Sequence, residues 1–253
     1  MNHFADHFSA ASDDYARYRP VYPTSLFETL AGHAPGPGLA WDCATGNGQA
    51  ALGLARHFRR VYASDASAQQ IREAKTHPHI EYRVAAAEHS GLDDASVDLI
   101  TVAQALHWFD HDAFYREARR VARPGALIAA WTYVLLDISP DINAAVSQLH
   151  GDILGDWWPA ERRHVDNGYR DLPFPFETVD LPAFVMTARW SLNDLLGYLQ
   201  TWSATRRYRQ QLGHDPVGHI TAQLHSFWGP AETCREVRWP LTLLAGRVHK
   251  TPD

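Results

Sequence analysis

Short apolar runs alternate with amphipathic stretches along the first 133 residues of the chain. Short apolar runs bounded by turn residues indicate strands, whereas apolar residues gathered on one side of a longer stretch indicate a helix. The run "SVDLITVAQAL" is apolar almost throughout, which is typical of a strand buried on both faces. On this basis we predict strands at 39–43, 61–65 and 80–84, within "SVDLITVAQAL", and at 126–131.

Helices are predicted between these strands. Residues 48–58 are amphipathic, Ser67 can cap the start of a second helix, and a third helix runs from Asp110 to a stop before Pro124. Strands that alternate with helices indicate a parallel sheet with right-handed crossovers.

The pattern changes after residue 133. Residues 134–190 are rich in aromatic residues and proline without a clear alternation of elements, and we expect an insertion over the ligand edge of the sheet. A single helix is predicted from Ser191, with Asp194 completing a capping box, to Gly213. Two closing strands broken at Pro240 are expected to pair with each other, antiparallel, at the sheet edge.

Composition excludes several classes of protein. The chain has 253 residues with 45% hydrophobic and 21% charged content, as in ordinary globular proteins. A net charge of −6 gives no electrostatic support for a nucleic-acid partner. No apolar run approaches the ~18 residues of a membrane span, and the N-terminal stretch lacks the apolar core of a signal peptide. Only Cys43 and Cys234 are present, which favours reduced thiols and a cytoplasmic location.

The stretch "WDCATGNGQAALGLA" contains a glycine turn between a predicted strand and a predicted helix. Gly46, Gly48 and Ala51 satisfy the spacing G-x-G-x-x-G/A, which is a weak match by itself. Its place between strand and helix favours a nucleotide-like ligand, either a dinucleotide or S-adenosylmethionine.

The acids around the turn help to choose between these two ligands. A pyrophosphate on the turn would face the carboxylate of Asp42, and like charges in a partly dry site repel by a few kcal/mol or so. S-adenosylmethionine carries an ammonium and a sulfonium, so Asp42 favours the methyl donor; the alternative is that Asp42 only braces the loop. Asp65 ends the second strand, where it can accept hydrogen bonds from ribose hydroxyls of either ligand or cap the next helix.

With "AAAEHSGLDDASVDLITVAQALHWF" and "RVARPGALIAAW", these motifs carry a family resemblance. The sequence resembles the class I S-adenosylmethionine-dependent methyltransferases, most closely the methyltransferase type 11 branch of small-molecule enzymes that includes trans-aconitate methyltransferase-like proteins. The pieces "DCATGNGQA", "YASDAS", "YARYRPVYP" and "YLQTWSA" also match, so the resemblance covers most of the chain. One departure is Ala44, which stands where the family has the first glycine of its turn. Because a methyl group is small, we expect donor binding to survive there.

The elements and the resemblance together predict an α/β fold. We expect a Rossmann-like, seven-stranded, mostly parallel sheet with helices on both faces, an antiparallel closing strand and a helical, aromatic insertion over the active site. We expect residues 1–253 to form a single domain with four parts. These are donor-covering N-terminal helices at 1–36, a donor-binding core at 37–133, a substrate-side insertion at 134–190, and a closing helix and strands at 191–253.

The resemblance also implies roles for individual residues toward S-adenosylmethionine. Asp42 anchors the loop near the methionine amino group, Asp65 holds the ribose, and Gln104 lies beneath the methionine part. Tyr15 and Arg19 close over the donor, unless they belong to a surface helix. The implied donor-binding residues are Tyr15, Arg19, Asp42, Ala44, Gly46, Gly48, Asp65, Ala66, Ala87, Glu88 and Gln104.

Residues on the acceptor side are less distinctive. His107 follows Gln104 where the methyl group should emerge, so it is a candidate general base or substrate contact, or simply a packed loop histidine. Trp108 and Trp157 are candidates for the walls of the substrate site or for core residues. Arg206 could anchor a carboxylate, or it could complement the dipole of a helix end.

We therefore expect methyl transfer to a small molecule, as O-methylation, with a carboxylate as one candidate acceptor. The rivals are a non-catalytic S-adenosylmethionine-binding protein and an NAD-dependent oxidoreductase, although the chain lacks a Tyr-x-x-x-Lys pair after the fourth strand. A serine hydrolase is disfavoured by the absence of a G-x-S-x-G elbow. His3 with His7, and His107 with His111, have a helical spacing suited to a metal, but no third ligand stands out, so no metal is expected. The oligomeric state cannot be inferred.

Overall fold

The computed structural model describes residues 18 and 20–249 of the chain. Two compact units can be distinguished, and each is described by itself. The sheet unit comprises Tyr22–Tyr133, Arg163–Phe184 and the described residues from Leu241 on. The helical unit comprises Val134–Arg162, Val185–Pro240 and the described residues before Tyr22.

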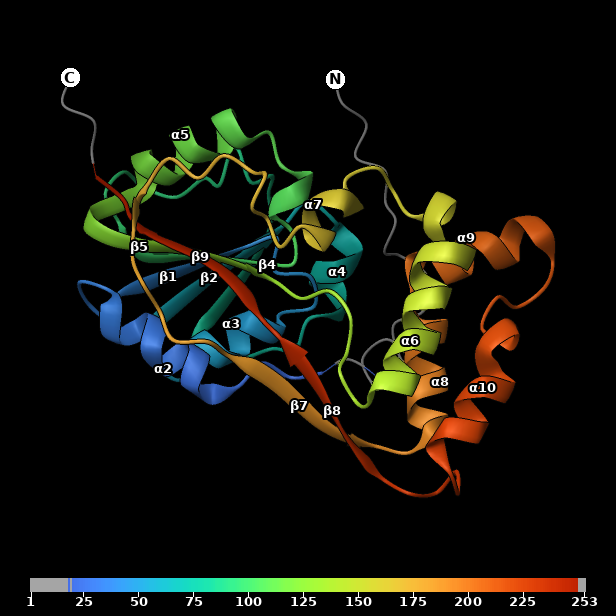
Figure 1. Ribbon diagram of the computed structural model, residues 1–253. Coiled ribbons are helices and arrows are strands. Elements are labelled where there is room, and N and C mark those ends of the chain that lie inside the picture. Colours follow the sequence, from blue (N-terminus) through green and yellow to red (C-terminus); the bar gives the residue numbers. More distant parts are fainter. Residues whose placement is uncertain (1–17, 19, 250–253) are drawn as a thin grey trace. The chain divides into compact units, whose positions relative to one another are not determined.

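The sheet unit is built on seven strands in the order β3-β2-β1-β4-β5-β9-β6 (Figure 1). Strands β1 to β5 are parallel where they pair, and β9 runs antiparallel to both of its neighbours. The predicted mostly parallel sheet with an antiparallel closing strand is confirmed. The strands are β1 (Leu39–Cys43), β2 (Arg60–Asp65), β3 (Ile80–Val84), β4 (Val97–Ala103), β5 (Ala122–Thr132), β6 (Glu177–Thr178) and β9 (Thr242–Arg247).

Helices cover both faces of this sheet, with α2 and α3 on one face and α5 on the other (Figure 1). Alternation along β1 explains how the two faces differ. Trp41 packs against Phe114 of α5, whereas its neighbour Asp42 points toward the opposite side. Side-chain caps start two of the helices: Ser67 accepts from the Gln70 amide, and Asp110 accepts from the Ala113 amide. The helices of the sheet unit are α2 (Thr24–His33), α3 (Gln49–Leu54), α4 (Ala68–Glu73), the 3-10 turn η1 (Leu106–Trp108), α5 (His111–Val121) and α7 (Arg162–Asp166), whose first residue belongs to the helical unit.

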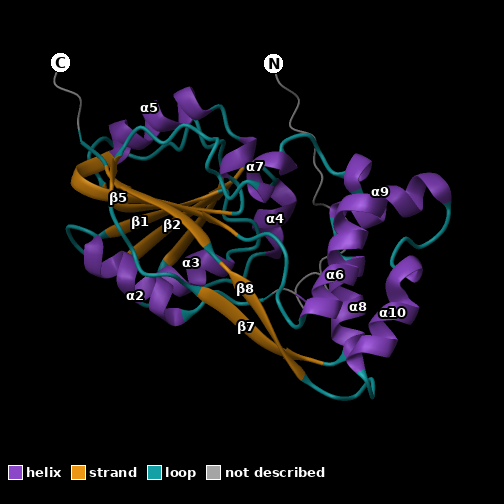
Figure 2. Ribbon diagram, in the orientation of Figure 1, coloured by secondary structure: helices purple, strands orange, loops and turns teal. Residues whose placement is uncertain are grey.

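The helical unit contains most of the remaining helices and a two-stranded antiparallel sheet of β7 and β8 (Figure 2). Aromatic side chains form much of its interior, including Trp190, Tyr198 and Trp239, whose rings lie 4.8–5.8 Å apart. Its elements are α6 (Pro140–Gln148), the π-helical turn η2 (Leu149–Ile153), η3 (Gly155–Trp157), β7 (Val185–Trp190), α8 (Leu192–Gln200), α9 (Ser203–Leu212), α10 (Gly218–Trp228) and β8 (Arg235–Pro240).

The single helix predicted from Ser191 to Gly213 is wrong, because the segment forms α8 and α9. The chain breaks at Trp202, which is extended at φ −63° and ψ 136°. The hydroxyls of Thr201 and Thr205 donate to carbonyls of the last turn of α8, which satisfies acceptors at the helix end. The capping box at Ser191 and the left-handed end at Gly213 are confirmed.

The pairing predicted for the last two strands is also wrong. The chain does break at Pro240, but β8 pairs with β7 of the helical unit, and β9 pairs with β5 and β6 of the sheet unit. The cause is β7, whose apolar side chains Met186 and Trp190 give β8 a partner from within the segment expected to be an insertion.

None of the helices in the described part of the chain combines the length and the apolar composition needed to cross a membrane.

Candidate functional site

The glycine turn lies at the carboxyl end of β1, where parallel strands of an open sheet bind ligands. Ala44, Gly46 and Gly48 adopt left-handed backbone angles, with φ of 54°, 58° and 87°. The Thr45 amide donates to the carbonyl of Ser64 at 2.9 Å, which ties the turn to β2. A side chain at Gly48 would overlap the phenol of Tyr82, since an added Cβ would lie 2.3 Å from its hydroxyl. The turn is thus held in one shape from two neighbouring strands.

Ala44 takes the conformation that glycine adopts more readily. We therefore expect Ala44→Gly to relieve a backbone cost of about 1–2 kcal/mol, offset by about 0.5–1 kcal/mol of added unfolded-state entropy. The expected result is a variant of equal or slightly greater stability, by up to about 1 kcal/mol, with unchanged donor affinity. Urea unfolding and calorimetric titration with S-adenosylmethionine measure both quantities. The control is Ala50→Gly in α3, which should lose about 1 kcal/mol; a comparable loss at position 44 would contradict the prediction.

Asp42 is fully buried and braces the turn. Its Oδ2 accepts from the Thr45 hydroxyl at 2.5 Å, and its Oδ1 accepts from the Thr101 hydroxyl of β4 at 2.8 Å. Burial raises the pKa of Asp42 to about 6, although these hydrogen bonds act in the opposite direction. The loop-anchoring role of Asp42 is seen directly, whereas its proximity to a donor amino group stays a prediction.

Asp65 ties the end of β2 to the same turn. One carboxylate oxygen accepts from the Gly46 amide and the other from the Ser67 amide, both at 2.8 Å. Both carboxylate oxygens of Asp65 are therefore held at the junction of the glycine turn and the start of α4. Ala66, the next residue, is exposed beside it.

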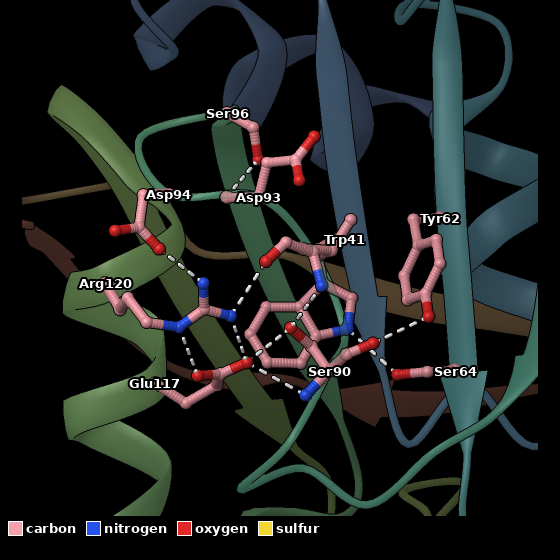
Figure 3. A network of polar contacts seen from close by, with 10 residues as sticks. Trp41, Tyr62, Ser64, Ser90, Asp93, Asp94, Ser96, Glu117 and Arg120 are labelled. Carbon is pink, nitrogen blue, oxygen red and sulfur yellow. Dashed lines mark hydrogen bonds and ion pairs between the residues drawn. The ribbon is translucent and has the colours of Figure 1, made fainter.

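Ala87 and Glu88 lie in the connection between β3 and β4, which is fastened to α5 by a polar network. Figure 3 shows Glu117 and Arg120 of α5 pointing toward this connection. Glu117 accepts from both the amide and the hydroxyl of Ser90, at 2.9 and 2.5 Å, and from Arg120 at 2.8 Å. Glu88 itself accepts from the Asp110 amide at 3.4 Å, so it lies beside the start of α5.

Gln104 ends β4 in a left-handed conformation, with φ 58°. Its side-chain oxygen accepts from the Thr132 hydroxyl at 2.8 Å, and its side-chain nitrogen donates to the Tyr133 carbonyl at 3.1 Å. Thr132 is the last residue of β5 and Tyr133 follows it, so Gln104 is fixed at the carboxyl edge of the sheet near the glycine turn of β1.

His107 and Trp108 lie in η1, which begins two residues after Gln104, and their ring centroids are 4.8 Å apart. The Nδ1 of His107 lies 3.0 Å from the hydroxyl of Tyr169. The sequence analysis missed Tyr169, because no local pattern predicts a contact between residues 62 positions apart.

Two of the histidines considered for a metal have other contacts, and His3 and His7 lie outside the described residues. His107 meets Tyr169, and the Nε2 of His111 lies 3.0 Å from the Leu106 carbonyl oxygen. Within the described ranges, no group of three or more His, Cys, Asp or Glu residues could hold a metal ion.

Two candidates for the acceptor site lie in the helical unit. Trp157 packs against Tyr208, with ring centroids 5.1 Å apart, and its carbonyl accepts from Arg207 at 3.4 Å. Arg206 is half-buried on α9. Tyr15 and Arg19 lie outside the described residues.

A half-open cavity of about 460 Å³ also lies in the sheet unit, beside β9 and the segment 169–181. Leu172, Phe174, Leu181 and Leu243 contribute apolar walls. No residue of the glycine turn lines it, so the donor-binding edge is a different place.

The charge around the end of β1 helps to choose between a dinucleotide and S-adenosylmethionine as the ligand. The pKa of the buried Cys43 thiol is raised well above its usual value, first by burial and then by the negative charges of Asp42, Glu88 and Asp65. The negative charges of these three acids therefore all act on the end of β1. A cationic nucleoside derivative fits this environment, and a pyrophosphate does not. The fold and the site together define a Rossmann-like protein that binds a positively charged nucleoside.

Comparisons with known proteins agree. The family described as "methyltransferase domain" matches residues 41–130. A curated "putative methyltransferase" of Dictyostelium discoideum is 36% identical over 225 residues, which are 87% of this chain and 86% of that protein. A solved structure described as a "putative type II methyltransferase" from Anaeromyxobacter dehalogenans is 48% identical, with a TM-score of 0.87 over 92% of this chain and 99% of the other.

The chain belongs to the class I S-adenosylmethionine-dependent methyltransferases, and S-adenosylmethionine is its methyl donor. This family assignment rules out the NAD-dependent alternative. It agrees with the charge of Asp42, which favours a cationic ligand over a pyrophosphate.

Proposed function

We propose that this methyltransferase methylates an oxygen atom of a small molecule in the cytoplasm. The observation that carries the proposal is His107, which follows the strand end at Gln104 and meets the buried hydroxyl of Tyr169 at 3.0 Å. A histidine held in this way is suited to accept the proton of a hydroxyl acceptor. The two free cysteines, Cys43 and Cys234, support the proposed location.

In this proposal the donor is held by the carboxyl edge of the sheet. Asp65 accepts from the ribose hydroxyls while keeping its bonds to Gly46 and Ser67. Ala66, Ala87 and Glu88 border the adenine, and Gln104 lies under the methionine part. Ala44, Gly46 and Gly48 let the backbone approach the donor, and Asp42 sets a negative potential behind the turn. Tyr15 and Arg19 are proposed to cover the donor, as the family resemblance implies.

When bound, S-adenosylmethionine supplies a methyl group on a sulfonium, whose leaving group is a neutral thioether. His107 takes the acceptor's hydroxyl proton, the oxygen lone pair forms the new bond to the methyl carbon, and the electrons of the carbon–sulfur bond go to sulfur. The proton then passes from His107 to solvent. Positioning and exclusion of water supply much of the remaining acceleration, and Trp108 is proposed as a wall of the acceptor site.

A carboxylate acceptor is the second candidate. It is ionised at neutral pH and needs no base. The arginines of α9 favour it, with Arg206 as the proposed anchor and Trp157 beside Arg207 as a wall. Arginine suits this role because its planar fork meets a carboxylate with two parallel hydrogen bonds.

The test is a screen of hydroxyl and carboxyl compounds with methyl-labelled S-adenosylmethionine, followed by mass-spectrometric location of the label. We expect a methyl ether or methyl ester product. For a hydroxyl acceptor, His107→Gln should lower kcat by about 10²–10⁴-fold, whereas the exposed-histidine control His225→Gln should not. Full activity of His107→Gln on a carboxylate would select the second candidate, and products labelled only on nitrogen or carbon would refute O-methylation.

A further inference from the structure

Tyr169 is a buried tyrosine whose hydroxyl reaches the expected catalytic histidine. Its side chain is 1% exposed, its ring centroid lies 5.9 Å from that of His107, and its hydroxyl is 3.0 Å from Nδ1. The two residues come from distant parts of the chain but from the same sheet unit.

The backbone that presents Tyr169 is unusual. Gly168 and Tyr169 both adopt left-handed angles, with φ of 60° and 61°. Their amides donate at 2.8 Å to the carbonyls of Val165 and His164, so the two residues form the end of α7. For a residue as bulky as tyrosine this conformation is unfavourable, and it persists only where the surroundings hold it.

Contacts on either side fix this turn in the sheet unit. A Cβ added at Gly168 would meet the side chain of Thr242 in β9 at 3.2 Å, so the backbone passes close to that strand. His164 and Asp171 pair across the turn at 2.9 Å. The direction of the Tyr169 hydroxyl is therefore set by the fold.

We infer that Tyr169 is the positioning residue of His107, holding its imidazole in the tautomer that leaves Nε2 as the proton acceptor. This inference rests on the proposed function, in which His107 takes a proton from the methyl acceptor. A neutral imidazole that acts as a base at Nε2 carries its proton on Nδ1, and that N–H needs an acceptor. The oxygen of Tyr169 lies where this acceptor is needed, and it accepts the same bond after His107 becomes an imidazolium. The pair thus keeps one geometry through the proton transfer.

A second tyrosine provides a matched control. Tyr115 of α5 is 2% exposed, and its hydroxyl donates to the Pro173 carbonyl at 2.6 Å. Pro173 lies in the segment Arg163–Phe184, which also carries Tyr169. Tyr115→Phe removes a hydroxyl that contacts this segment, and Tyr169→Phe removes a hydroxyl that belongs to it. Only Tyr169→Phe removes a contact of His107.

The first experiment is long-range ¹H–¹⁵N NMR on the full chain with ¹⁵N-labelled histidine, in which His107→Gln identifies the signal of His107. We expect His107 of the unaltered protein to be in the Nδ1–H tautomer. In Tyr169→Phe the populations should shift toward the Nε2–H tautomer, and in Tyr115→Phe they should not change. An Nε2–H tautomer in the unaltered protein would overturn the inference without any variant having to fold. An unchanged His107 signal in Tyr169→Phe would overturn it as well.

The second experiment is kinetic and uses a hydroxyl acceptor from the screen. Tyr169→Phe should lower kcat about tenfold, displace the acidic limb of the kcat/KM pH profile, and leave the KM for S-adenosylmethionine unchanged. A fall in kcat for His107→Gln but none for Tyr169→Phe would refute the positioning role of Tyr169 and leave His107 as the proposed base. Full activity of His107→Gln on that acceptor would refute the proposed base, and the role of Tyr169 with it.

Discussion

Glu117→Gln is expected to destabilise the protein by about 2–3 kcal/mol and to weaken S-adenosylmethionine binding about tenfold. Glu117 is 8% exposed and fastens the β3–β4 connection to α5 by accepting from Ser90. Within α5 it also accepts from Arg120, which in turn donates to Asp94 and to the Leu92 carbonyl of the connection. Glutamine keeps one acceptor but places an amide donor against these donors. It also removes one of the two carboxylate partners of Arg120, which keeps Asp94. Binding should suffer because Ala87 and Glu88, the proposed neighbours of the adenine, lie on that connection.

Urea unfolding and calorimetric titration of the donor test this expectation. The matched control is Glu81→Gln on β3, because Glu81 likewise pairs with arginine, here with Arg60 and Arg83, but is 39% exposed. Exposed pairs contribute about 0.2–1 kcal/mol, so the control should change little. Equal stabilities and donor affinities in the two variants would mean that the network does not hold the connection.

The same network predicts a pH dependence of stability. Burial acts to raise the pKa of Glu117, but hydrogen bonds from Arg120 and Ser90 outweigh it and lower that pKa to about 2. Since the ordinary value is 4.5, the stabilisation is present above about pH 4.5 and is lost as the pH falls from there toward 2. In Glu117→Gln this acid limb of the stability curve should be smaller.

Local patterns in the sequence predicted the sheet unit well. β1 and β4 are apolar runs and β3 alternates, and two of the helices between the strands carry side-chain caps, at Ser67 and Asp110. The order of motifs then placed Asp42, Asp65 and Gln104 at strand ends on one edge of the sheet. Such features depend on neighbours within a few residues, so one sequence is enough to reveal them.

Contacts between distant segments could not be predicted in this way. The partner of β8 is β7, some 50 residues earlier, and neither strand shows which edge it prefers. Two threonines end α8 at a point where the helical periodicity continues. Tyr169 meets His107 only because the chain returns to the sheet unit with α7. The bracing of Asp42 by Thr101 likewise requires knowing that β1 and β4 are neighbours.

Asp42→Asn is expected to weaken S-adenosylmethionine binding at neutral pH by about tenfold to thirtyfold. The carboxylate is fully buried, so its charge is poorly screened. At an effective dielectric constant of about 20, two opposite charges about 8 Å apart attract by roughly 2 kcal/mol. Asparagine has nearly the same shape, so most of the loss should come from the charge. Calorimetric titration with S-adenosylmethionine at pH 7 measures it.

The pKa of Asp42 gives this prediction a second, sharper form. Because that pKa is raised from 3.8 to about 6, the folded protein holds a proton on Asp42 at a pH where the unfolded chain does not. Ionisation of Asp42 therefore costs stability as the pH rises from about 4 to 6, up to about 3 kcal/mol in total. The ionised form is also the one that attracts the cationic donor. Donor affinity should consequently rise between pH 5 and 7, a range in which the donor's amino group stays charged, while the stability of the free protein falls between pH 4 and 6.

Both trends should disappear in Asp42→Asn, and a second buried acid supplies the control. Asp98 of β4 is 1% exposed and accepts from the Leu39 amide and from Arg123, at the opposite end of the sheet. Asp98→Asn should lower stability but keep the rise of donor affinity with pH. A donor affinity that varies equally with pH in unaltered protein and in Asp42→Asn would show that another group titrates on binding. Asp42 would then act only as a brace of the turn, and the preference for a cationic ligand would have to come from Asp65 and Glu88.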